Sequence, residues 1–166
     1  MLILPVIVFG TMLVEARRAG VNERAQRGRG GVEPPGDVYQ LMRIAYPGAF
    51  LAMILEGAWR GAPSAAFIPA GAVLFLAAKA LKWWAIFSLG RFWTFRVIVV
   101  PGAHLVASGP YRWLRHPNYV GVMGELAGVA LMTGAWRSGA AGIAGFGWLI
   151  ARRVTIEELA LREAAR

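Results

Sequence analysis

The stretch GPYRWLRHPNYVG, residues 109–121, lies between two long apolar runs. Its thirteen residues include two Arg, two Pro, three aromatic rings and His116, one of the two His in the chain. Pro is favoured at the first position of a helix, because its missing N–H would have no partner there. His116-Pro117 therefore predicts the start of a helix, with the free amides of residues 118–120 pointing toward one face of the membrane.

Apolar runs on both sides of this stretch decide the fold class. The chain is 57% hydrophobic and 16% charged, whereas soluble domains carry about 25% charged residues. A bilayer is crossed by ~17–25 apolar residues in a helix. We therefore predict an all-α integral membrane protein, a single membrane-embedded domain over residues 1–166 with about five transmembrane helices: Leu2–Val14 (extending to about Ala16), Val38–Ala58 with a kink at Pro47, Pro63–Phe87, Asn118–Trp136 and Gly139–Ala151.

Polar segments connect these runs. Glu15–Asp37 is rich in Gly, Pro and Arg and is expected to be a solvated, flexible loop. Arg91–Ser108 is β-prone on both sides of a Pro-Gly turn signal, which predicts a short cytoplasmic hairpin or loop before the fourth helix. His104 in this segment is expected to be a surface residue. The third run ends in Lys and Trp residues of the kind found at membrane interfaces, namely Lys79, Lys82, Trp83 and Trp84.

The net charge of +9 would suggest nucleic acid in a soluble protein. Here the enrichment of Lys and Arg in cytoplasmic loops explains it better, and we expect no nucleic-acid partner. With the N-terminus outside, only Arg60 and Arg137 of the 18 Lys and Arg residues fall on the outer side. Residues 109–121 and the chain after the fifth run then share the cytoplasmic face. Two His and no Cys exclude a convincing zinc site, so we expect no metal.

Residues 109–121 suit a small ligand that carries an anion together with a cation or a flat ring. A helix start binds anionic groups, and Arg112 and Arg115 donate to a carboxylate or phosphate. The rings of Tyr111, Trp113 and Tyr119 can hold a cation. The alternative is an ordinary interfacial belt of aromatic and basic residues.

Acidic residues add further candidates. Glu125 lies roughly 12 Å below Pro117 along the fourth helix at 1.5 Å per residue, and an acid at such depth is a functional candidate. The alternative is an ion pair, for example with Arg43. Glu157 and Glu158 follow the fifth run; their directions differ by about 100°, so at most one should face a site. The alternative for this pair is a solvated tail.

Glycines in the fourth run indicate close helix packing. Gly124 and Gly128, together with Gly121, form a small-residue face of the kind that lets two membrane helices approach each other.

Several of these motifs together resemble the isoprenylcysteine carboxyl methyltransferase family, in its bacterial branch. The matching motifs are Leu89–Trp93, Gly109-Pro110-Tyr111, Arg115-His116-Pro117-Asn118-Tyr119, and Arg153 with Glu157-Glu158-x-x-Leu161. The resemblance implies a membrane methyltransferase, with the cofactor-binding half at about residues 79–166. It also implies S-adenosylmethionine as cofactor and a lipid-like or prenylated acceptor that enters from the membrane lipids, in a bacterial inner membrane.

Site roles follow from that resemblance. It implies a cofactor pocket lined by Tyr111, Arg115, His116, Pro117, Tyr119, Gly121, Glu157 and Glu158. It implies that Arg153 steers the acceptor. A carboxylate acceptor needs no base, whereas a phenol or enol hydroxyl needs a proton acceptor, for which His116 and Glu125 are the candidates.

Two other functions remain open at this point. The Arg-His-Pro-x-Tyr motif also occurs in related membrane sterol and steroid reductases, which use NADPH. A non-enzymatic membrane adaptor would need only the interfacial belt.

Overall fold

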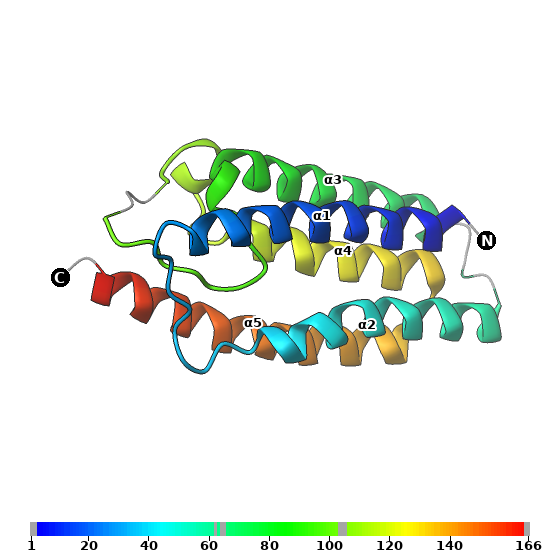
Figure 1. Cartoon of the computed structure of the whole chain (residues 1–166). Helices are drawn as coiled ribbons and strands as arrows, with labels where there is room; N and C mark the ends of the chain where they lie inside the picture. The colour runs from blue at the N-terminus through cyan, green and yellow to red at the C-terminus, as the bar shows by residue number, and fades with distance from the viewer. Residues whose placement is uncertain (1–2, 62, 64–65, 103–105, 165–166) are drawn as a thin grey trace.

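Five helices form a bundle in the computed structural model, which describes residues 3–61, 63, 66–102 and 106–164 (Figure 1). The helices are α1 (Ile3–Arg27), α2 (Tyr39–Arg60), α3 (Phe67–Leu89), α4 (Pro117–Thr133) and α5 (Trp136–Ala164). Two short 3₁₀ turns, η1 (Gly90–Phe92) and η2 (Gly109–Arg112), lie in the connection between α3 and α4. Within these described ranges no strand forms, which confirms the all-helical prediction.

Two stretches are long and apolar enough to cross a membrane, namely Tyr39–Arg60 and Phe67–Phe92. Only 22% and 28% of their apolar windows are buried inside the bundle. Their outer faces therefore present large apolar side chains, among them Leu51 and Leu55 on α2 and Val73 and Leu76 on α3. Such wide exposed apolar surface is typical of a protein in contact with lipid. The predicted spans in α1, α4 and α5 remain predictions.

Helices α3 and α4 pack with their backbones almost in contact. A Cβ added at Gly128 would lie 2.8 Å from the backbone N of Phe75 and 2.9 Å from the carbonyl oxygen of Gly71. One added at Gly121 would meet the Cβ of Lys82 at 2.8 Å, and one at Gly124 would meet the Cβ of Ala78 at 2.7 Å. The predicted small-residue face is confirmed, and its partner is α3.

The main core lies between α2, α4 and α5. Phe50, Met53, Leu126 and Val129 are fully buried in it. The ring of Tyr46 packs edge-on against Phe50 and at 5.0 Å against Phe146 of α5. Helix α2 continues through Pro47 without a break.

Two polar segments are more ordered than the sequence suggested. The prediction of a flexible loop from Glu15 was wrong, because α1 continues to Arg27 and buries Glu15 and Gln26. The amide of Gln26 donates to the carbonyl oxygen of Arg91, so α1 is fastened to the start of the α3–α4 connection. The charged tail after residue 151 was also expected to lie beyond the last helix, but α5 continues through it to Ala164.

The predicted hairpin before α4 does not form in the described part of the chain. Val99 pairs instead with Val32 of the α1–α2 loop in an isolated antiparallel bridge. The return half of the hairpin was expected at residues 104–107; His104 lies outside the described residues. Because Val32 and Val99 are far apart in the chain, the local sequence pattern around neither residue predicts their pairing.

One end of the bundle collects the segments that the charge pattern placed together. The α1–α2 loop, the α3–α4 connection and the C-terminal part of α5 lie at the same end, opposite the N-terminus (Figure 1). The end of α2, the start of α3 and the α4–α5 connection lie at the other end.

Candidate functional site

A cavity of about 740 Å³ opens at the end of the bundle where the polar segments meet. This volume lies within the range of ~300–1,000 Å³ that is usual for small-molecule pockets. Its wall comes from α2, the start of α4, the C-terminal part of α5 and the segment Trp93–Val100. The predicted site residues that line it are Tyr111, Arg115, His116, Tyr119, Arg153, Glu157 and Glu158.

His116 stands where α4 and α5 meet. Its Nε2 lies 3.5 Å from Oε1 of Glu158, and its Nδ1 lies 4.0 Å from Oε2 of Glu157. The imidazole stacks on the ring of Tyr119, with centroids 5.6 Å apart, and the Tyr119 hydroxyl donates to Oε2 of Glu157 at 3.0 Å. The geometry therefore joins the Arg-His-Pro turn to the glutamate pair across about forty residues of sequence.

Both glutamates face the cavity, whereas the helical spacing predicted that only one would. Both glutamates are among the residues that line the cavity. Each carboxylate is about one-third exposed. The guanidinium of Arg115 lies 3.8 Å from Glu158 and is otherwise exposed.

Helix α4 starts where predicted, but two of the three backbone amides that were predicted to be free are hydrogen-bonded. Pro117 is the first helical residue and His116 precedes it as the N-cap. The amides of Tyr119 and Val120 donate to the carbonyl oxygen of His116 at 3.1 and 3.4 Å, so these two are not available to an anion. An anionic group at this site would depend on Arg115 instead.

Pro117 and Gly121 do not line the cavity, although both were expected to. Pro117 is fully buried at the helix start, and Gly121 faces α3. Their contribution is the placement of α4. Arg112 and Trp113 also lie outside the cavity; Trp113 is 69% exposed and packs at 5.9 Å against Trp84, as in an interfacial belt.

Arg153 is buried in the cavity wall. Its guanidinium lies 3.4 Å from Oδ1 of Asp37 and donates to the carbonyl oxygen of Phe95. Its Nε has no hydrogen-bond partner among the described residues. A buried donor without a partner is costly.

Glu125 does not line the cavity, and its partner is not Arg43. It is 1% exposed and accepts a hydrogen bond of 2.6 Å from the Tyr46 hydroxyl. Its carboxylate also lies 3.0 Å from Lys79 and 3.4 Å from Lys82. Only Tyr46 and Lys82 of this group reach the cavity.

Sequence reasoning missed Tyr46 and Lys82. Lys82 was assigned to a membrane interface, yet it is 2% exposed and pairs with Glu15 at 2.7 Å. Two lysines three residues apart in an apolar run, with acids in two other apolar runs, were a signal for a buried ion cluster.

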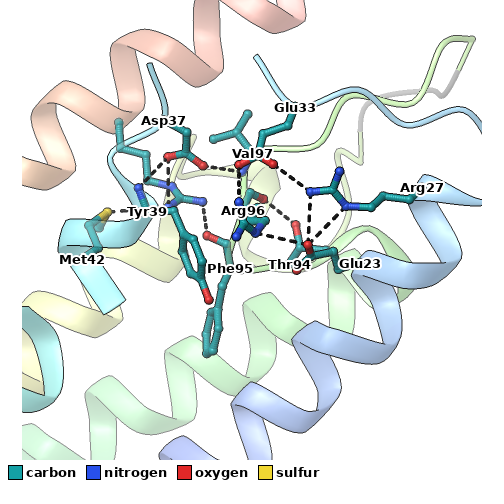
Figure 2. Close-up of polar contacts among 11 residues, drawn as sticks. Glu23, Arg27, Glu33, Asp37, Tyr39, Met42, Thr94, Phe95, Arg96 and Val97 are labelled. Carbon is teal, nitrogen blue, oxygen red and sulfur yellow. Dashed lines mark hydrogen bonds and ion pairs between the residues drawn. The ribbon is translucent and has the colours of Figure 1, made fainter. Parts of the chain in front are cut away.

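The segment Trp93–Val100 lines the cavity, and we call it the cover. Figure 2 shows the polar contacts of its residues Thr94, Phe95, Arg96 and Val97. Arg96 holds it to α1 and to the α1–α2 loop through Glu23 at 3.2 Å and Glu33 at 2.7 Å. The backbone amide of Val97 donates to Asp37, the same carboxylate that pairs with Arg153. The cover is thereby linked to both the loop and α5.

Two side chains at the end of the bundle that holds the cavity have pKa values shifted from their ordinary values. Burial, with the nearby charge of Glu157, raises the pKa of Tyr111, so its phenol stays neutral. Burial also raises the pKa of Glu33, but hydrogen bonds from Arg96 and Arg27 outweigh it, so the pKa of this carboxyl lies below its ordinary value.

The cavity suits a zwitterion that also carries a positive charge and a flat ring. Glu157 and Glu158 can pair with an ammonium group, and Arg115 can pair with a carboxylate. The rings of Tyr111 and Tyr119 offer faces for a cation or a heterocycle. This donor set fits S-adenosylmethionine, as the resemblance implied.

Comparison with known proteins points to the family that the motifs resemble. The model of the isoprenylcysteine carboxyl methyltransferase family matches residues 71–163. The chain is 33% identical over 116 residues to the uncharacterized protein YpbQ of Bacillus subtilis, covering 69% of this chain and 68% of that protein. It is 24% identical over 141 residues to an uncharacterized protein of Haemophilus influenzae, covering 84% and 82% of the two chains. No solved structure matches.

The matched residues include the whole of α4 and the part of α5 that carries Arg153, Glu157 and Glu158. The chain therefore belongs to the isoprenylcysteine carboxyl methyltransferase family, a family of membrane methyltransferases that use S-adenosylmethionine.

Proposed function

We propose that the protein transfers a methyl group from S-adenosylmethionine to an oxygen atom of a lipid-like acceptor. One observation carries the proposal: the glutamate pair of α5 lies against His116 at the start of α4, on the wall of a single cavity. The family's motifs thus form one site although they lie far apart in the chain.

The chain's own residues then bind the donor. S-adenosylmethionine supplies a methyl group that its positively charged sulfur already activates. Glu157 and Glu158 pair with the donor's ammonium group, and Arg115 pairs with its carboxylate. Tyr119, stacked on His116, offers a ring face to the positive charge. Catalysis is then mainly a matter of positioning and of excluding water.

The acceptor enters from the bilayer in this proposal. The exposed apolar faces of α2 and α3 place lipid beside the bundle, and much of the cover's contribution to the cavity wall is apolar, from Trp93 to Val100. Arg153, which lines the cavity, would hold a polar group of the acceptor. The cavity end faces the cytoplasm and the N-terminus lies outside, in a bacterial inner membrane.

Thermal unfolding in detergent tests the donor. We expect S-adenosylmethionine and its demethylated product to raise the melting temperature, and NADPH to leave it unchanged. Stabilisation by NADPH alone would instead indicate a reductase, and no shift with any of the three would indicate an adaptor.

Calorimetry tests the site. His116→Ala and Glu157→Ala should each weaken S-adenosylmethionine binding by about tenfold or more, the loss expected when a hydrogen bond to a charged group is removed. Glu163→Ala, which removes an exposed carboxylate from the same helix, is the matched control and should leave affinity unchanged. Equal affinity in all three variants would contradict the assignment.

A further inference from the structure

A buried proton-accepting pair lies at the wall of the cavity. The hydroxyl of Tyr46 donates to Oε2 of Glu125 at 2.6 Å, and its oxygen accepts from Nζ of Lys82 at 3.4 Å, so one lone pair is left for another donor. Tyr46 lines the cavity and Glu125 lies behind it. The second oxygen of Glu125, Oε1, has no hydrogen-bond partner among the described residues.

The charged residues around Tyr46 and Glu125 balance one another, and most of them are buried. Glu15 from α1 and Lys79 and Lys82 from α3 complete a group of two acids and two lysines. Both acids are 1% exposed and Lys82 is 2% exposed. Lys82 also lies 3.4 Å from the Tyr46 hydroxyl. Helix α5 packs the apolar ring of Phe146 against Tyr46. The other cations on the cavity wall are Arg43, Arg96, Arg115, Arg153 and Arg162.

The pair continues the cavity face of α4. His116, Tyr119 and Val122 line the cavity at successive steps of three residues. Glu125 is the next step, roughly 9 Å deeper than Tyr119 at 1.5 Å per residue. The donor-binding residues are therefore near the mouth of this face, and the Tyr46–Glu125 pair lies toward the bilayer.

We propose that Tyr46 is a further catalytic residue, which accepts the proton of a hydroxyl acceptor while passing its own proton to Glu125. This inference rests on the proposed methyl transfer. A carboxylate acceptor is already anionic and would have no use for a proton-accepting pair, whereas a hydroxyl must lose its proton as it is methylated.

The step balances. The sulfur–methyl bond breaks with its electron pair left on sulfur, and the new bond forms between the methyl carbon and the acceptor oxygen. The acceptor O–H bond breaks, its proton goes to the Tyr46 oxygen, and the Tyr46 proton goes to Glu125. Lys82 stabilises the negative charge that develops on the phenolic oxygens. After the product leaves, the proton returns through Tyr46 to water.

Binding without turnover gives the first test. A 4-alkylphenol can donate a hydrogen bond to the Tyr46 oxygen, whereas its methyl ether cannot. The wild-type protein should bind the phenol about fivefold more tightly than the ether, the value of one ordinary hydrogen bond. Tyr46→Phe keeps the ring packing and should abolish this preference. Thr155→Val, which removes an exposed hydroxyl of α5 outside the cavity, is the control.

Acceptor acidity gives the second test. With a 4-alkylphenol, Tyr46→Phe and Glu125→Gln should lower kcat by about 10²–10⁴-fold, the usual contribution of a positioned proton acceptor. The loss should shrink as pH rises, and it should vanish with a 2,6-dinitro-4-alkylphenol, which is already ionised at neutral pH. Tyr46→Phe decides the outcome if Glu125→Gln fails to fold.

The outcomes separate this inference from the proposed function. Methylation of alkyl carboxylates but not of phenols, or a Tyr46→Phe loss that is the same for ionised and neutral phenols, would overturn the proton transfer and leave the methyltransferase assignment standing. The ion cluster would then serve only to hold the helices together. Failure to bind S-adenosylmethionine would overturn the proposed function itself.

Discussion

Individual charged residues inside the bundle follow one rule, which is that each has an opposite partner. Lys82 pairs with Glu15 and Glu125 rather than extending to the membrane interface. Removing one member would leave an uncompensated buried charge, a loss of about 3–5 kcal/mol. This group therefore stabilises the arrangement of α1, α3 and α4 whatever its part in the chemistry.

Tyr119 offers a mild substitution at the donor site. Tyr119→Phe removes the hydrogen bond that orients Glu157 but keeps the ring stacked on His116. We expect S-adenosylmethionine affinity to fall by roughly tenfold, as for a hydrogen bond to a charged group. Titration calorimetry in detergent measures this. Thr155→Val, outside the cavity, is the control, and an unchanged dissociation constant for Tyr119→Phe would show that Glu157 needs no such support.

At the scale of elements, the contact between α3 and α4 depends on glycine. Gly128→Ala would force its new Cβ against backbone atoms of Phe75 and Gly71, which cannot move independently. We expect a loss of about 1–3 kcal/mol, typical of overpacking, seen as a lower melting temperature in detergent. Gly145→Ala on α5 meets nothing within 4 Å and should be neutral or slightly stabilising, because Ala is the better helix former.

The cover is an element whose position depends on partly exposed ion pairs. Arg96→Gln removes its links to Glu23 and Glu33. Such pairs contribute about 0.2–1 kcal/mol each, so protection of the Val97 and Val99 amides against hydrogen exchange should fall by roughly threefold to tenfold. Arg137→Gln at the opposite end of the bundle is the control. Unchanged protection would mean that the Val32–Val99 bridge alone holds the cover.

Acid should loosen the same element. The folded-state pKa of Glu33 lies below its ordinary value of 4.5, so its stabilising contribution is fully present above that value. The contribution is lost as the pH falls through the lower, folded-state pKa. Exchange of the Val97 and Val99 amides, corrected for intrinsic rate, should therefore accelerate below about pH 4.5. Glu33→Gln should remove this part of the pH dependence, and a variant that kept it would point to another carboxylate.

At the scale of the whole molecule, the bundle has two chemically different ends. Because the chain has no Cys, single cysteines report on each end separately. Glu163→Cys near the C-terminus should react with a membrane-impermeant maleimide only in inside-out vesicles. Arg137→Cys between α4 and α5 should react only in intact spheroplasts. The reverse pattern would place the cavity outside the cell.

Local signals were enough for several parts of the structure. The start of α4 at His116-Pro117 follows from the chemistry of proline. The small-residue face of α4 follows from helical spacing, and the positions of α2 and α3 follow from hydropathy to within a few residues. Each of these features is decided by neighbours in the chain, so it is visible in the sequence.

Other parts were decided by contacts between distant segments. Only the folded chain turns Glu15–Arg27 into a helix with a buried acid, pairs Val99 with Val32, and brings both Glu157 and Glu158 to His116.

The sequence by itself therefore determined the all-helical fold with its two apolar helices α2 and α3, the family, and most of the predicted site residues that line the cavity, because these depend on local pattern and on motif. Tertiary structure alone decided which charges pair and where the cover lies. It also decided that Tyr46 stands between Glu125 and the cavity. The physical reason is that a buried charge selects its partner by distance in space, and several acids and bases in the chain were equally suitable by composition.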